Sequence, residues 1–420
     1  MTVRTLRQVI AANRAGDVSA QPSICSAHPD VLRAVMLMPE ARRRSLLIEA
    51  TSNQVNQDGG YTGMQATDFV AFLHGLADET EFPKDQLILG GDHLGPQAWK
   101  GLPADQALAK AHTLVASYVE AGFTKIHLDC SEGTAGEPPH LDDDTVAKRA
   151  AALARTCEDH APDPDRLAYI VGTEVPVPGG AHSDHEGIHP TSPESARQTM
   201  TIHRQTFDAG ARERIVGLVV QPGVEFGAEA VDHLPVEDTT RLRPVLDDFP
   251  GLTFEAHSTD YQKPDAYPRL AKMGFAIHKV GPALTFAYRQ AIYALDLMCA
   301  TLTGQGPRVA GALEAAMMED PTSWQGHYAG SESQQKLLRH FGYSDRVRYY
   351  WPKASVQSAV ASLFADLDGK VPPEPMLLQY FTPDCLHRAA DIPAGRSLAE
   401  RLVLGNIQAA LAPYYFEGAA

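Results

Sequence analysis

Residues 87–96 read Leu-Ile-Leu-Gly-Gly-Asp-His-Leu-Gly-Pro, a short apolar run that ends in two glycines, a carboxylate and an imidazole. An apolar run of this length bounded by Gly and Pro is typical of a buried strand. The next stretch, Pro103–Ala121, has helical periodicity, and a second β-like run begins at Lys125. A strand, a helix and a strand in this order predict a βα unit of a parallel sheet.

The same alternation recurs through the first two-thirds of the chain. Most of the β-like runs are separated by helical stretches such as Asp143–Ala161. A closed (β/α)₈ TIM barrel is the simplest solution, and a doubly wound open sheet is disfavoured because no GxGxxG turn follows the first strand. After about residue 300 the pattern changes to helical stretches with loops rich in Gly and Pro, so we expect a barrel over residues 1–300 and a helical C-terminal extension over residues 301–420. The eight predicted strands are Ser23–Cys25, Leu46–Ala50, Leu87–Gly91, Lys125–Asp129, Ala168–Gly172, Ile215–Val220, Thr253–His257 and Ala276–Gly281.

The overall composition limits the classes of partner. The formal net charge of −16 disfavours nucleic acid and anionic membranes, which would repel such a surface. No apolar run approaches transmembrane length, and Met1–Gly16 lacks the apolar core of a secretory signal. The five cysteines are far apart and have no CxxC spacing, so neither a disulfide framework nor a zinc ribbon is indicated. We therefore expect a soluble cytoplasmic protein that binds neither nucleic acid nor membrane.

Polar residues are concentrated where the predicted strands end, which is the edge at which barrel enzymes place their chemistry. A set of imidazole and carboxylate ligands with open positions suits zinc, manganese or another transition metal. We predict that His93, Glu174 and His257 bind one divalent cation, zinc or manganese, and that Asp92 transfers a proton near its open positions. The alternatives are that Asp92 caps a helix, that the histidines are satisfied polar residues, and that Glu174 forms a salt bridge.

The segment 125–132 ends its strand with two more carboxylates. Asp129 is predicted to contact substrate or to orient a metal ligand, and Glu132 to take part in catalysis. Helix capping by Asp129 or Ser131 is the alternative.

An amide-rich loop follows the second strand. We expect Asn53, Gln54 and Gln57 to hydrogen-bond sugar hydroxyls, together with Ser258 after the seventh strand. No GxxxxGK[ST] loop occurs, so no nucleotide cofactor is expected.

Five stretches of the chain, taken together, resemble the tagatose-bisphosphate aldolase Z-subunit family. The resemblance implies a class II aldolase-like barrel, in which Asp92 transfers a proton and His93 and His257 bind metal. Class II aldolases carry another histidine at the fifth strand, where this chain has Glu174. An anionic ligand weakens the metal as a Lewis acid, which argues against full aldolase activity. The five stretches are Ile48–Met64, Gly90–Gly95, His127–Gly133, Gly172–Gly180 and Glu255–Tyr261.

The resemblance leaves three functions open. The first is a subunit that supports a catalytic aldolase subunit in cleaving tagatose bisphosphate to triose phosphates, and an oligomer is then expected. The second is an independent metal-dependent epimerase or aldolase acting on a ketohexose or hexuronate, with Asp92 as the acid and base. The third, a tagatose 6-phosphate kinase, is disfavoured because no nucleotide motif occurs.

Overall fold

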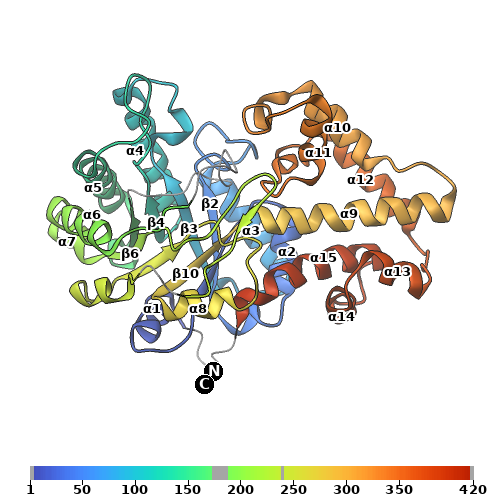
Figure 1. Cartoon of the computed structure of the whole chain (residues 1–420), viewed down its shortest axis with the longest axis horizontal. Coiled ribbons are helices and arrows are strands. Elements are labelled where there is room, and N and C mark those ends of the chain that lie inside the picture. Colours follow the sequence, from blue (N-terminus) through green and yellow to red (C-terminus); the bar gives the residue numbers. More distant parts are fainter. Residues whose placement is uncertain (1–3, 173–187, 238–240, 417–420) are drawn as a thin grey trace.

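The computed structural model describes residues 4–172, 188–237 and 241–416, and its centre is a closed parallel barrel (Figure 1). The strands follow one another around the barrel in the order β1-β10-β9-β6-β5-β4-β3-β2. Each barrel strand overlaps one of the eight predicted runs, so the predicted TIM barrel is confirmed. The strands are β1 (Gln21–Cys25), β2 (Leu46–Thr51), β3 (Leu87–Leu94), β4 (Lys125–Leu128), β5 (Ala168–Val171), β6 (Ile215–Val219), β9 (Thr253–Ala256) and β10 (Phe275–Val280). A short hairpin, β7 (Glu225–Phe226) with β8 (Val231–Asp232), lies outside the barrel sheet.

Side chains on each strand alternate between the surrounding helices and the barrel interior. On β4, Ile126 and Leu128 join the main apolar cluster beneath the helices, whereas Lys125 and His127 contact residues of other strands inside the barrel. The helices packed around the barrel are α1 (Leu6–Arg14), α2 (Pro29–Leu37), α3 (Ala66–Thr80), α4 (Ala104–Glu120), α5 (Asp143–His160), α6 (Pro193–Thr206), α7 (Ala209–Glu213) and α8 (Ala266–Lys272).

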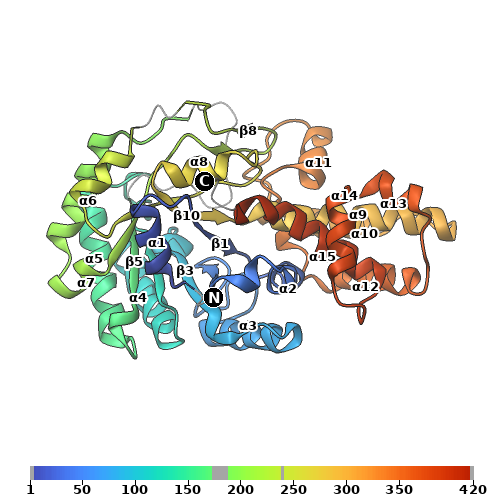
Figure 2. The same ribbon diagram turned by 90° about the horizontal axis from the view of Figure 1, so that it is seen from below.

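One long helix, α9 (Pro282–Thr303), leads from the barrel into the C-terminal helices (Figures 1 and 2). The last long helix, α15 (Leu398–Leu411), packs back against α9, α14 and α2. Gln408 on α15 donates to the carbonyl oxygen of Ala34 on α2 at 2.8 Å, which ties the C-terminal helices to the barrel. The remaining helices are α10 (Val309–Glu319), α11 (Glu332–Phe341), α12 (Ala354–Leu367), α13 (Glu374–Tyr380) and α14 (Pro383–Asp391).

Glycine permits a close contact between α14 and α15. A Cβ atom on Gly405 of α15 would lie 2.7 Å from the carbonyl oxygen of Cys385 on α14, so only glycine lets the two backbones approach this closely. Among the helices that the structure describes, none is both long and apolar enough to cross a bilayer.

Candidate metal and substrate site

Three imidazoles gather inside the barrel near the C-terminal ends of its strands. His93 lies on β3, His127 on β4, and His257 directly follows β9. Their ring centres are 5.0 Å (His93 to His127), 5.2 Å (His93 to His257) and 5.2 Å (His127 to His257) apart. With metal–nitrogen bonds of about 2.1 Å, three imidazoles around a tetrahedral cation have ring centres roughly 5 Å apart. The spacing therefore fits a single shared cation.

Each of these histidines uses one ring nitrogen to contact a carboxylate. His93 Nδ1 lies 2.7 Å from Asp129 Oδ2, His127 Nδ1 lies 3.1 Å from Asp92 Oδ1, and His257 Nε2 lies 2.9 Å from Glu255 Oε1. The other nitrogen, Nε2, of both His93 and His127 is buried and has no hydrogen-bond partner in the described chain. A carboxylate behind each imidazole, with the second nitrogen left over, is the arrangement that orients histidines toward a metal.

Two carboxylates of this group are themselves placed to bind a cation. One potential ligand atom from each of Asp92, His127, Glu255 and His257 lies within 4.8 Å of the others. Burial lowers the pKa of His257 to about 3, which keeps the ring in the neutral form that metals bind. The donor set of imidazole nitrogen and carboxylate oxygen suits zinc or manganese.

Asp92 is ionised despite complete burial. Burial alone would raise its pKa, but the neighbouring His93, the charge of Lys279 and a hydrogen bond from His127 lower the pKa well below its ordinary value. Lys279, on β10, contacts Asp92 Oδ2 directly. Cys25 Sγ also lies 3.7 Å from that oxygen, and burial raises the pKa of the thiol well above its ordinary value, so the thiol stays protonated.

A buried lysine connects two carboxylates deeper in the barrel. Lys125 on β4 contacts Glu49 on β2, and its Nζ lies 2.8 Å from Glu255 Oε2 on β9. All three side chains are fully buried. Gly90 makes room for this group, because a Cβ atom there would lie 2.8 Å from Glu49 Cγ. Since Glu255 also contacts His257, it links the Lys125 charge to the histidine cluster.

The backbone is strained where two of the strands end. His93 (φ 46°) and Ser258 (φ 53°) both occupy the left-handed region, which costs a non-glycine residue about 1–3 kcal/mol. Such strain persists where the surrounding contacts hold the backbone, as the 2.7 Å contact between His93 and Asp129 does here.

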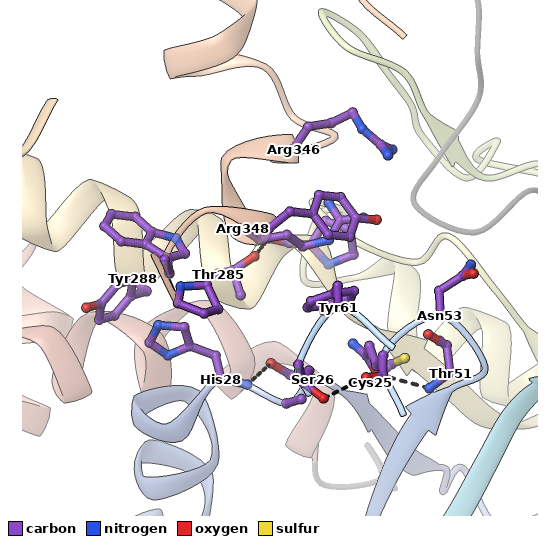
Figure 3. Close-up of a pocket in the computed structure, with 18 of the residues that line it drawn as sticks. Cys25, Ser26, His28, Thr51, Asn53, Tyr61, Thr285, Tyr288, Arg346 and Arg348 are labelled. Carbon is purple, nitrogen blue, oxygen red and sulfur yellow. Dashed lines mark hydrogen bonds between the residues drawn. The ribbon is translucent and has the colours of Figure 1, made fainter. Parts of the chain in front are cut away.

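A cavity of about 860 Å³ opens from this cluster (Figure 3). His93, His257 and Lys279 form part of its wall. Figure 3 shows the barrel residues Cys25 and Thr51 on one side of the cavity and Arg348, from the C-terminal segment, on the other.

The predicted site residues that the structure describes fall into three groups, which line the cavity, lie behind its wall, or lie outside it. His93, His257, Ser258, Asn53 and Gln54 line the cavity. Asp92 and Asp129 lie behind the wall and contact its histidines.

Two other candidates lie outside the cavity wall. Gln57 donates to the carbonyl oxygen of Lys110 at 3.0 Å. Glu132 accepts hydrogen bonds from Gln97 (2.9 Å) and Lys100 (2.8 Å). Glu174 is outside the described residues.

His127, Glu255 and Lys279 were not predicted as site residues from the sequence. Strand periodicity was the available signal, because residues 125, 127 and 129 share one face of their strand, and so do residues 255 and 257. Glu255 therefore had to lie on the same side of its strand as His257, and His127 on the same side as Asp129.

Residues 6–419 match the family described as D-tagatose-1,6-bisphosphate aldolase subunit GatZ/KbaZ-like. The chain belongs to the GatZ/KbaZ-like family. The predicted family resemblance is thus confirmed, and it places the protein in carbohydrate metabolism.

Two relatives of the GatZ/KbaZ-like chain are closely similar over nearly its full length. D-tagatose 6-phosphate 4-epimerase of Agrobacterium fabrum is 49% identical over 383 residues, which cover 89% of this chain and 90% of that protein. The crystal structure of a probable tagatose 6 phosphate kinase from Sinorhizobium meliloti 1021 is 46% identical, with a TM-score of 0.84, and the match covers 94% of this chain and 99% of that one.

Proposed function

We propose that this protein is a metal-dependent epimerase that inverts C4 of a ketohexose 6-phosphate, interconverting tagatose 6-phosphate and its 4-epimer, fructose 6-phosphate. The observation that carries the proposal is the set of three carboxylate-backed histidines beside a cavity large enough for a sugar phosphate. The 49% identical relative named as an epimerase supports the choice of reaction. We therefore prefer the epimerase to the accessory subunit, which was the first function predicted from the sequence.

Inversion at C4 poses a specific chemical problem. C4 is not adjacent to the C2 carbonyl, so the hydrogen on C4 is not acidified by that group. A retro-aldol step avoids the problem: the C4 hydroxyl loses its proton, the C3–C4 bond breaks, and its electron pair forms the enediolate of dihydroxyacetone. The other fragment is glyceraldehyde 3-phosphate. Its aldehyde group rotates to present its opposite face to the enediolate, the C3–C4 bond re-forms, and the proton returns to the oxygen of the new C4 hydroxyl.

The residues of the site match these needs. A divalent cation bound by His93, His127 and His257 would supply Lewis-acid polarisation of the C2 carbonyl. We assign proton transfer at the C4 hydroxyl to Asp92 with its contact Lys279, which reaches the cavity wall. Asn53 and Ser258 on the wall are the assigned partners of the remaining hydroxyls.

Turnover in D₂O tests the proposal. We expect the purified, manganese- or zinc-loaded protein to convert tagatose 6-phosphate to fructose 6-phosphate without another subunit, with the hydrogen on C4 retained as protium. NMR of the product reads both outcomes. Deuterium at C4 would contradict the bond-cleavage route, and the absence of any product would contradict the epimerase.

Asp129 gives a second test, because its contact fixes the orientation of His93. We expect Asp129→Asn to weaken metal binding about 10- to 100-fold, the usual effect of losing a carboxylate behind a ligating histidine. Competition with a chromogenic chelator measures the affinity. The same substitution at Asp142, an exposed residue that caps α5 and is not part of the cavity wall, is the matched control, and an unchanged affinity in Asp129→Asn would count against His93 as a ligand.

The accessory role remains the second candidate, favoured by the description of the family as an aldolase subunit. Under that function the protein alone turns over no sugar phosphate, and cleavage of tagatose bisphosphate rises only when a catalytic aldolase subunit is added. The two candidates are separated by assaying the protein with and without that subunit.

A further inference from the structure

Two guanidinium groups reach the substrate cavity from the C-terminal part of the chain. Arg346 and Arg348 both line the cavity that His93 and Lys279 also line. In Figure 3 they project from the same C-terminal segment, on the side opposite Thr51. Within the described part of the chain, neither has a carboxylate within salt-bridge distance, although the protein carries a net charge of −16. Buried or half-buried arginines of an acidic protein normally pair with an acid.

Backbone and aromatic groups hold the two arginines in place. Arg348 donates to the carbonyl oxygen of Asp345 at 3.2 Å and to Tyr349 Oη at 2.9 Å. Arg346 donates through Nε to the carbonyl oxygen of Ser323. Both guanidiniums lie over the Tyr349 ring, with Cζ 5.0 Å (Arg346) and 4.5 Å (Arg348) from its centre. The two cations are therefore fixed beside one another before any ligand binds.

The segment that carries them is itself anchored to the barrel side of the molecule. Asp345, in the left-handed region (φ 46°), accepts from Thr285 Oγ1 at 2.6 Å and pairs with Arg289 Nε at 2.9 Å, both on α9. Tyr261, which follows β9, donates to the carbonyl oxygen of Tyr343 at 2.6 Å. The position of the arginines over the cavity is thus set by contacts of their segment with α9 and with the residue after β9, as a pre-organised binding site requires.

The electrostatic field at this wall favours an anion. Burial alone would raise the pKa of Tyr349, but the charges of Arg348 and Arg346 lower it below its ordinary value. A negatively charged oxygen is therefore stabilised where the Tyr349 hydroxyl lies.

We propose that Arg346 and Arg348, with the Tyr349 hydroxyl, bind the phosphate ester of the substrate at the wall of the cavity away from the histidine cluster. This assignment rests on the proposed function and adds the residues that distinguish a phosphorylated sugar from a free one. Two guanidiniums supply the paired donors and the charge that a phosphate dianion needs, which exceeds what a single carboxylate requires. The C-terminal segment would thereby complete a site whose chemistry resides in the barrel.

Inorganic phosphate tests the site without requiring turnover. We expect phosphate to raise the thermal unfolding temperature of the wild-type protein in a saturable way, and acetate at matched ionic strength to have little effect. Arg348→Met is expected to raise the half-saturating phosphate concentration about 10- to 100-fold. Arg348→Lys is expected to have an intermediate effect, because lysine keeps the positive charge but lacks the paired N–H donors of the guanidinium. Arg346→Met provides an independent variant in case Arg348→Met does not fold.

Arg308→Met is the matched control, since Arg308 pairs with Asp366 away from the cavity and its loss is expected to leave phosphate binding unchanged. Equal phosphate affinity in wild type, Arg346→Met and Arg348→Met would overturn the assignment, as would an equal response to acetate. In kinetics, kcat/KM for tagatose 6-phosphate is expected to fall at least about tenfold in Arg348→Met and to be unchanged in Arg308→Met. Arginine-dependent phosphate binding without any epimerisation would support the phosphate site and contradict only the proposed function.

Discussion

Replacing His257 by glutamine is expected to lower turnover of tagatose 6-phosphate about 10³-fold and to remove most of the bound divalent metal. The physical reason is geometric, because His257 completes the triangle of ring centres 5.0–5.2 Å apart with His93 and His127. Without it, the remaining imidazoles hold a cation from one side only. Steady-state kinetics and metal analysis after gel filtration measure the two quantities on the same sample.

The control for this substitution is a buried histidine outside the barrel interior. His203 on α6 is fully buried, and its Nδ1 contacts the carbonyl oxygen of Thr199 at 2.8 Å. His203→Gln is expected to keep both metal and turnover, whereas His127→Gln is expected to behave like His257→Gln. Full metal content in His257→Gln would show that the cation lies elsewhere.

The barrel could be predicted from the sequence because its signals are local. Most strands are short, largely apolar runs that end in polar or small residues, and most are followed by a stretch with helical periodicity. For example, the predicted helix Asp143–Ala161 coincides with α5, whose start is set by Asp142 accepting from the Thr145 backbone N–H. Local signals of this kind can be recognised in the sequence without knowledge of the tertiary contacts.

The site was only partly predictable because its contacts are not local. The histidine motifs at residues 93 and 257 stand out by themselves, and Glu255 is a local partner of His257, but the pairing of His93 with Asp129 becomes evident only when β3 is brought beside the end of β4. Glu174, after the fifth strand, was the carboxylate predicted for the metal site, and the structure adds His127 and Glu255 as candidates there. Strand periodicity could have identified both.

The arginines of the cavity wall gave no signal in the sequence at all. Arg346 lies more than 60 residues beyond the last barrel strand, and its place over the cavity depends on the pairing of Asp345 with Arg289. A contact of this kind requires the packed C-terminal helices, so neither spacing nor composition could have revealed it.

The buried charge at the base of the site leads to the largest expected effect on stability. Lys125 compensates Glu49 and Glu255, and all three side chains have no exposed surface. Burial alone would lower the pKa of Lys125, but the two carboxylates raise it above its ordinary value, so the lysine is charged in the folded protein. We expect Lys125→Met to reduce the free energy of unfolding by about 3–5 kcal/mol, because the change leaves two buried carboxylates without a cation. Urea-induced unfolding followed by circular dichroism measures the loss.

A double-mutant cycle separates the lost ion pair from the lost packing. Methionine keeps most of the volume of lysine, so the cavity created by Lys125→Met is small and the charge dominates the cost. In a Glu49→Gln background only Glu255 is left uncompensated, and the same lysine substitution should then cost clearly less. If Lys125→Met costs equally much in both backgrounds, the Lys125–Glu49 contact makes no contribution of its own. If it costs less than about 1 kcal/mol in the wild-type background, the carboxylates are not held as a charged pair by Lys125. Because Glu255 joins this lysine to His257, a large loss would also mean that the position of a candidate metal ligand depends on a charge buried one layer deeper in the barrel.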